Sequence, residues 1–162
     1  MRIRLTLFAV SALLFVGSIG FVVAGARAQR RPATSAAVAL TPVGSVKQIM
    51  RGIVDPAATT VFGAVSTTVT AAGVEEKAPA TQAEWDAVAD SAAALAEAGN
   101  LLLVGSRVVD EGEWTTISRK MIDAGKKTLV AAEAKNAEEV FASGDVIYET
   151  CDTCHSKYRR TE

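Results

Sequence analysis

Apolar positions repeat at helical spacing over four stretches of the chain, with polar residues between them. In the first stretch the apolar side chains that share one face are Val46, Ile49, Met50, Ile53 and Val54. Thr41-Pro42 is typical of a helix start, because proline is tolerated in the first turn. Asp55-Pro56 interrupts the pattern, since proline removes a backbone donor. We therefore predict a kink there and a helix that continues to about Ala72.

The second helix is predicted from a cap and a long apolar stripe. Gly73 to Ala80 is expected to be a connection. Thr81-Gln82-Ala83-Glu84 has the capping-box pattern, in which hydroxyl and carboxylate satisfy the free amides of the first turn. The apolar stripe that follows runs from Trp85 to Leu103, and the helix should end near Val104-Gly105.

Two further helices follow a connection from Gly105 to Glu113. The third is marked by Trp114, Ile117, Met121, Ala124 and Thr128 and should end near Lys135. Asn136 is a good cap for the fourth, with acidic residues in the first turn where the helix dipole favours them. The fourth helix should run to about Arg159.

No alternating strand pattern is visible in the sequence, and there is no internal repeat. Four amphipathic helices with short connections predict an all-α fold, an antiparallel four-helix bundle over residues 41–162. Residues 29–40 are expected to be a flexible N-terminal segment.

The N-terminus has the pattern of a secretion signal. A short basic head precedes an uncharged run from Leu5 to Val23, and Ala26 and Ala28 then form the A-x-A arrangement that signal peptidase cleaves. We predict export to the periplasm and cleavage after residue 28. The alternative is an uncleaved membrane anchor, because the apolar run is near the length that spans a bilayer.

The net charge of the chain gives only weak information about its partners. Removing residues 1–28 leaves 14 Lys and Arg against 18 Asp and Glu side chains, a net charge of −4. A surface with this balance does not favour nucleic acid as a partner, and it weakly favours a basic one.

The only two cysteines and the only histidine lie within five positions near the C-terminus, in Cys151-Asp152-Thr153-Cys154-His155. C-x-x-C-H is typical of covalent attachment of c-type haem. Positions 0, +3 and +4 of a helix point the same way. Both thiols can then add to the vinyl groups while the imidazole binds iron, for which a proximal histidine is a common ligand.

Three other interpretations of the motif are weaker. Structural zinc usually needs four nitrogen or sulfur ligands, and this motif offers three. A thioredoxin-type C-x-x-C belongs at the start of a helix in a βαβ unit. A disulfide between Cys151 and Cys154 leaves His155 unexplained.

At the motif the chain resembles a known family. The stretch "LVAAEAKNAEEVFASGDVIYETCDTCHSKYR" is similar to the final helices of the class II c-type cytochromes, the family of cytochrome c-prime. Tyr158 and Arg159 stand where that family has an aromatic residue and an arginine. The resemblance covers Val43 to Arg160, and its specific part is the last thirty residues.

The resemblance implies two branches that differ at the sixth position of the iron. In one branch a methionine of the first helix binds the iron, and Met50 lies near that place. In the other the iron is five-coordinate under an apolar lid. Met121 is the second candidate thioether, which we expect to pack against the haem or the core. Without the resemblance, a methionine on an apolar stripe is most simply a core residue.

Two more residues are candidates for contact with the haem. Tyr148 lies one turn before Cys151 and is placed to pack on the porphyrin edge, although simple packing explains it as well. Arg159 lies one turn after His155, where it would either pair with a haem propionate or sit at a solvated helix end.

These features predict an exported cytochrome with one haem c that carries single electrons between a redox donor and a redox acceptor. The alternative is a five-coordinate binder of nitric oxide or carbon monoxide, as the resemblance allows. No acid–base or nucleophile set remains for an enzyme, since the sole histidine is committed. The resemblance also allows a homodimer formed through the first two helices.

Overall fold

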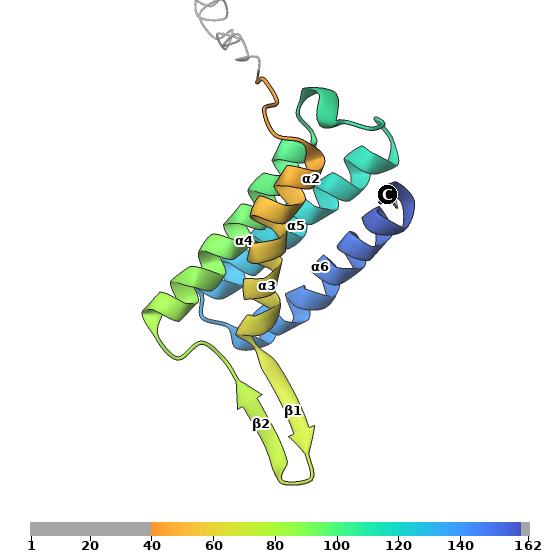
Figure 1. The fold of residues 1–162 in the computed structure, drawn as a ribbon. Helices are drawn as coiled ribbons and strands as arrows, with labels where there is room; N and C mark the ends of the chain where they lie inside the picture. The colour runs from red at the N-terminus through yellow and green to blue at the C-terminus, as the bar shows by residue number, and fades with distance from the viewer. Residues whose placement is uncertain (1–39, 160–162) are drawn as a thin grey trace, which may run out of the picture. The chain divides into compact units, whose positions relative to one another are not determined.

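The computed structural model describes residues 40–159, which form helices joined by short connections and one small sheet. In chain order the elements are α2 (Val46–Ile49), η1 (Met50–Val54), α3 (Asp55–Ala64), β1 (Ser66–Thr70), β2 (Gly73–Lys77), α4 (Gln82–Leu102), η2 (Gly105–Arg107), α5 (Glu113–Glu133) and α6 (Ala137–Tyr158) (Figure 1). The predicted signal or anchor and residues 29–39 lie outside the described residues.

The first helical run begins later than the sequence pattern predicts. Its N-cap is Ser45, and the Gln48 amide donates to Ser45 Oγ at 3.3 Å while the Ser45 amide donates to Gln48 Oε1 at 2.8 Å. This capping box satisfies two free amides of the first turn, and it decides where the helix starts. Thr41 and Pro42 precede the helix, so the predicted start there was wrong.

A π-helical segment, η1, stands where we expected a kink. Pro56 has no amide hydrogen, and its ring crowds the carbonyl four residues earlier. The chain adapts by widening the preceding turn: the Asp55 amide donates to the carbonyl of Met50, five residues back. Met50 is therefore the first residue of a local irregularity, a kind of feature that occurs often at functional sites.

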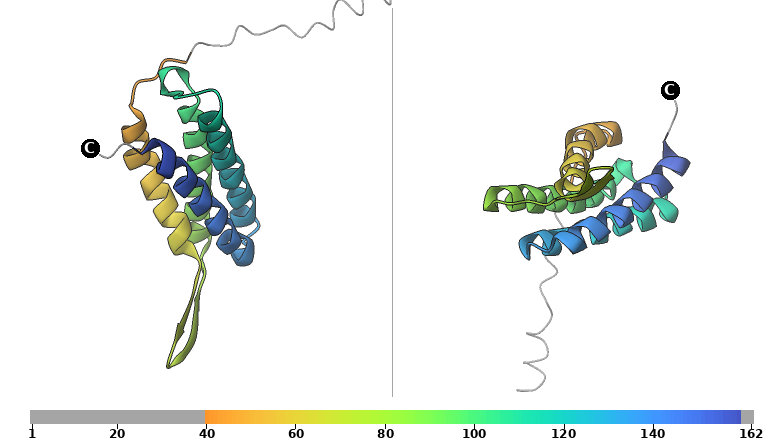
Figure 2. Two further views of the ribbon diagram at one scale, coloured as in Figure 1. Left: turned by 90° about the vertical axis from the view of Figure 1, so that its right-hand side faces the viewer. Right: turned by 90° about the horizontal axis from the view of Figure 1, so that it is seen from below.

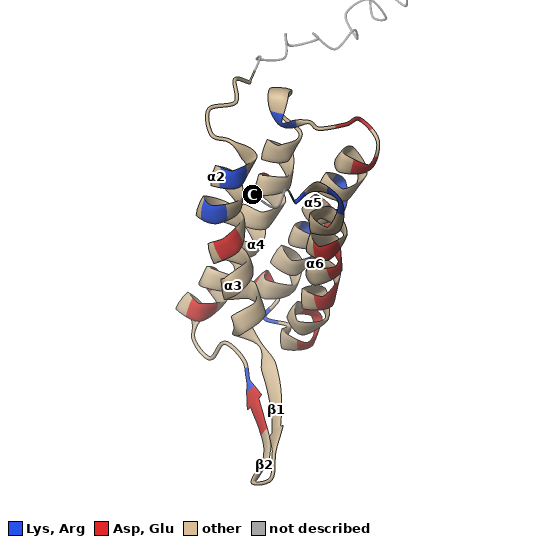
Figure 3. Cartoon of the chain, turned by 45° about the vertical axis from the view of Figure 1, so that its right-hand side comes forward, with Lys and Arg blue, Asp and Glu red and all other residues tan. Residues whose placement is uncertain are grey.

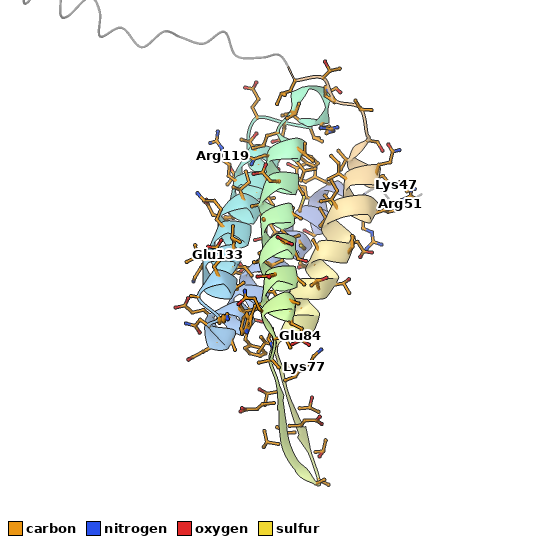
Figure 4. All side chains as sticks on the ribbon, turned by 90° about the vertical axis from the view of Figure 1, so that its left-hand side faces the viewer. Lys47, Arg51, Lys77, Glu84, Arg119 and Glu133 are labelled. Atoms are coloured by element: carbon orange, nitrogen blue, oxygen red, sulfur yellow. The ribbon has the colours of Figure 1, made fainter. Side chains whose placement is uncertain are left out.

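The sequence pattern missed a β-hairpin, β1–β2. The first helix ends at Ala64, not near Ala72, and β1 pairs antiparallel with β2. The segment Ser66–Thr70 is rich in β-branched residues, which favour an extended chain over a helix. The fold is therefore mostly helical but not purely α. The hairpin projects beyond the helices (Figure 2), and Figure 4 shows Lys77 and Glu84 at its base.

The predictions for the last three helices are confirmed to within a few residues. Thr81 and Glu84 form the expected capping box at the start of α4. Asn136 caps α6, where its side chain accepts a hydrogen bond from the Glu139 amide at 3.1 Å. In the part of the chain that the structure describes, no helix is both long and apolar enough to cross a membrane.

Small residues let α4 and α5 pack closely. A Cβ atom placed on Gly125 would lie 2.7 Å from the Ala96 amide nitrogen and 2.9 Å from the Ala92 carbonyl oxygen. One on Gly99 would lie 2.6 Å from Ile122 Cγ1. Helix α5 also packs along α6, and α3 packs on α4. Helix α5 therefore packs between α4 and α6, the helix that carries the C-x-x-C-H motif.

Candidate functional site

The last turns of α6 present the motif toward the helices around it. Cys151 and Cys154 are half-buried and pack against the main apolar core, whereas His155 is exposed. Thr150, just before the motif, is buried, and its hydroxyl donates to the Val146 carbonyl at 2.8 Å. The helix continues through the motif to Tyr158, so the two thiols and the imidazole have the one-turn spacing that the sequence predicts.

All four helical runs contribute to one small apolar cavity at the motif. Its lining includes Cys151, Cys154 and His155 of α6 together with Met50 and Met121, and it is completed by Val54, Leu102, Ile117, Ser118 and Thr150. The structure thus brings together five of the residues singled out in the sequence. Three of them come from one helix, and the two thioethers come from two others.

The two thiols have environments that suppress their reactivity as free cysteines. Burial raises the pKa of the Cys151 thiol, and burial together with the neighbouring Cys151 raises the pKa of Cys154. A disulfide oxidoreductase needs the opposite shift, because its attacking sulfur must be a thiolate. Both cysteines are free thiols in the structure. The thioredoxin-type interpretation therefore has neither the expected helix position nor the expected pKa.

The two methionines differ in their position relative to α6. Met121 is buried on α5, the helix that packs directly along α6. Met50 is half-buried at the start of η1, a segment that continues directly into α3 and packs on α4. The two axial ligands of a haem iron must approach from opposite faces of the ring. Were a haem held by this motif, Met50 would be the better candidate for the ligand opposite His155, because η1 does not pack along α6 as α5 does.

The donor set fits the chemistry of haem c, whereas the cavity beside it is small. Two thiols one turn apart, an adjacent imidazole and a thioether on another helix are the groups that such a cofactor uses. The cavity has a volume of about 30 Å³, close to that of one water molecule. A porphyrin would therefore require the helices that line the cavity to move apart.

Tyr148 and Arg159 lie away from this cavity. Tyr148 is 66% exposed and lines a different hollow, between α3 and α6, together with Phe62 and Phe141. Arg159 is exposed just beyond α6, where its backbone amide donates to the His155 carbonyl at 3.1 Å. The structure does not bring either side chain to the thiols.

An unforeseen clamp fixes the end of α6 beside the motif. The Tyr158 hydroxyl donates to Asp110 Oδ2, and its ring meets Trp114 edge-on, with centroids 5.1 Å apart. The Trp114 indole in turn donates to the Leu102 carbonyl at 3.1 Å. The hydrogen bond between Tyr158 and Asp110 lowers the pKa of Asp110 and raises the pKa of Tyr158. The residues after the C-x-x-C-H motif are thereby tied to the start of α5.

An ion pair reinforces this clamp. Lys157 pairs with Glu113, which raises the pKa of Lys157, and its Nζ atom also lies 5.5 Å from the centroid of the Tyr158 ring. Asp110 further accepts hydrogen bonds from the amides of Gly112 and Trp114. The Asp-x-Gly turn before α5 was the only sequence signal for these contacts, since their partners lie more than forty residues away.

Within residues 40–159, no group of three or more His, Cys, Asp or Glu side chains is arranged to hold a metal ion. Comparison with family models, curated proteins and solved structures gives no match for this chain.

Proposed function

We propose that this chain is an exported cytochrome with one covalently attached haem c, which carries one electron at a time between redox proteins. The observation that carries the proposal is the shared cavity of Cys151, Cys154, His155 and Met50. Two thiols, an imidazole and a thioether meet there in an apolar setting.

The chemistry of attachment needs only what the motif offers. Addition of each cysteine S–H across a vinyl C=C bond forms a thioether, with sulfur on one carbon and hydrogen on the other, so that no atoms are lost. His155 would hold the iron through one ring nitrogen, and Met50 would supply the opposite ligand. The haem supplies the one-electron couple, and the surrounding apolar side chains exclude water and tune its potential.

The lining of the cavity also supports an antiparallel four-helix bundle. Met50 comes from early in the first helical run and Leu102 from the last turn of α4. Ile117 comes from the first half of α5, and Cys154 from near the end of α6. In an up-down-up-down bundle, the start of one helix lies beside the end of the next, and the residues around this cavity follow that order. Export fits the same proposal, because c-type attachment occurs outside the bacterial cytoplasm.

The test is the mass and visible spectrum of the full chain, produced in a host that matures c-type cytochromes. We expect one haem to stay bound after extraction with acidified organic solvent, and a low-spin spectrum with a methionine-to-iron band. Polypeptide without added mass would overturn the haem proposal. A high-spin spectrum that changes on adding carbon monoxide would replace electron transfer by the gas-binding alternative.

A further inference from the structure

Two parallel stripes of exposed side chains run along the outer face of α6. One stripe is acidic and consists of Glu138, Asp145 and Asp152, spaced seven residues apart. The other consists of Phe141, Tyr148 and His155, also spaced by seven. Side chains at this spacing lie nearly above one another on a helix. The outer face of α6 therefore carries an aromatic row beside an acidic row, and the aromatic row ends at the candidate iron ligand.

The aromatic row borders a hollow rather than a smooth surface. Phe141 and Tyr148 are 54% and 66% exposed, and Phe62 of α3, 42% exposed, lies opposite them. Together with Asp145 they line a hollow of about 250 Å³ between α3 and α6. Phe62 lies close to α6 there, since a Cβ placed on Gly144 would be 3.7 Å from Phe62 Cδ1, an ordinary van der Waals contact. Exposed aromatic side chains around a hollow are typical of a binding surface.

The acidic row is free to attract a cation. From Ala137 to Ser156, α6 carries five carboxylates and no lysine or arginine, and Figure 3 shows the acidic positions along the helix. Among the residues that the structure describes, none of these five carboxylates forms an ion pair. Glu149, which belongs to neither row, lines a separate hollow with Lys120 and Lys127.

We propose that this face of α6, with Phe62, is the docking surface for a basic, lysine-rich electron-transfer protein; the inference rests on the proposed function and names its partner. An apolar centre rimmed by charge gives specific but short-lived binding, and opposite charge on the partner speeds the encounter. Seven residues of helix separate Tyr148 from His155, a rise of about 10 Å. A partner docked on this face therefore lies beside the haem-bearing turn.

A second copy of the chain fits this face poorly. Residues 40–159 contain 11 Lys and Arg against 17 Asp and Glu side chains, and every charged side chain on α6 from Ala137 to Ser156 is acidic. Pairing the face with itself would bring carboxylates against carboxylates, which is unfavourable. A basic partner gains attraction from the same charges.

The first test is an NMR titration of the ¹⁵N-labelled full chain with a lysine-rich mitochondrial-type cytochrome c as the probe. We expect the shifted amides to cluster on α6 between Phe141 and His155 and around Phe62, and the shifts to weaken as salt is added. Shifts confined to other helices, or no shifts at low salt, would overturn the docking surface. Because the titration needs no electron transfer, it decides the surface even if the chain carries no haem.

The second test is the rate at which the reduced, haem-loaded chain reduces the same probe. Glu138→Gln with Asp145→Asn should slow the reaction at low salt by about tenfold, because steering by charge is lost. The matched control, Asp90→Asn with Glu97→Gln, removes two exposed charges from α4 and should leave the rate within about twofold. Equal slowing in both variants would show a net-charge effect and overturn the proposal.

Tyr148→Ser separates the apolar part of the surface from the charged part. It should weaken binding of the probe at all salt concentrations, with an unchanged haem spectrum. If wild-type chain instead forms a dimer that this variant abolishes, the occupant is a second copy and the proposal is wrong. Haem content, measured first, keeps these outcomes apart from failure of the proposed function.

Discussion

At the scale of single residues, the candidate site depends on where two thioethers lie. Met50 and Met121 line the same cavity, but Met121 is carried by the helix that packs along α6, and Met50 comes from the irregular segment η1. The sequence alone ranks both as ordinary core residues, because methionine fills apolar gaps readily. In the proposed function Met50 is the iron ligand and Met121 is a packing residue.

This difference predicts distinct spectra for two alanine variants of the haem-loaded protein. Met50→Ala should abolish the methionine-to-iron band and allow carbon monoxide to bind the reduced iron, because the sixth position is vacated. Met121→Ala should keep the band and lose stability by about 2–5 kcal/mol, as a buried methionine is truncated. The reverse pattern would assign the iron to Met121.

The hydrogen bond between Tyr158 and Asp110 predicts a pH-dependent effect of Tyr158→Phe on stability. The bond lowers the pKa of Asp110, so its contribution is present above the ordinary pKa of aspartate, about 3.9, and is lost as the pH falls through the folded value. It raises the pKa of Tyr158, so the contribution is also lost as the pH rises beyond about 10. The variant should therefore differ most from wild type near pH 7.

The measurement is urea unfolding of both proteins from pH 3 to pH 11. Tyr148→Phe is the matched control, since its exposed hydroxyl has no hydrogen-bond partner among the described residues, and it should change stability at no pH. No difference between Tyr158→Phe and wild type at any pH would show that packing of the ring on Trp114, which phenylalanine keeps, and not the hydrogen bond, stabilises the end of α6.

At the scale of elements, the support of the site is the close packing of α4 on α5. Gly125 and Gly99 bring the two backbones together, and α5 then carries both Met121 and the clamp at Trp114. Apolar periodicity predicted both helices, but it did not predict which glycines lie at their contact. A glycine inside a helix lowers the stability of that helix, so we attribute the glycines at this contact to the close approach of the two backbones.

We therefore expect Gly125→Ala to destabilise the protein by about 1–3 kcal/mol, because the added methyl group would overlap the backbone of α4. The control is Gly63→Ala in α3, where no atom lies within 4 Å of an added Cβ. That substitution should be neutral or stabilise by up to about 1 kcal/mol. Chemical unfolding measures both, and equal effects would refute close packing at residue 125.

At the scale of the whole molecule, the candidate site and the hairpin are far apart along the helices. The cavity lies near the end of α4 and the end of α6, whereas the hairpin joins the end of α3 to the start of α4. All residues of β2 are exposed, and one bond from Lys77 Nζ to the Gly63 carbonyl, at 2.6 Å, ties the hairpin to α3. The hairpin is thus an addition to a helical fold that positions the site without it.

Replacing residues 67–76 by Asn-Gly should accordingly leave the site intact. Ser66 and Lys77 are partners in the ladder, so a two-residue turn can join them. We expect the free energy of unfolding to change by less than about 1 kcal/mol, since shortening a loop has a small entropic effect. Circular dichroism and haem content provide the check, and a loss of either would give the hairpin a structural role.

The sequence by itself determined the features that depend on neighbours in the chain. These include the three later helices with their caps at Thr81 and Asn136, the one-turn spacing of the thiols, and the chemistry of C-x-x-C-H. Local rules suffice there, because caps and helical periodicity involve residues at most a few positions apart. The same rules overlooked the β-branched run at Ser66–Thr70 and extended the first helix through it.

Only the tertiary structure decided which distant groups meet at the motif. It brought Met50 and Met121 into one cavity with His155, placed Tyr148 in a separate hollow, and joined Tyr158 to Asp110. Such contacts depend on how whole helices pack and turn. A single proline shows the reason: Pro56 widens the turn before it, and that local change sets where Met50 lies relative to the rest of the chain.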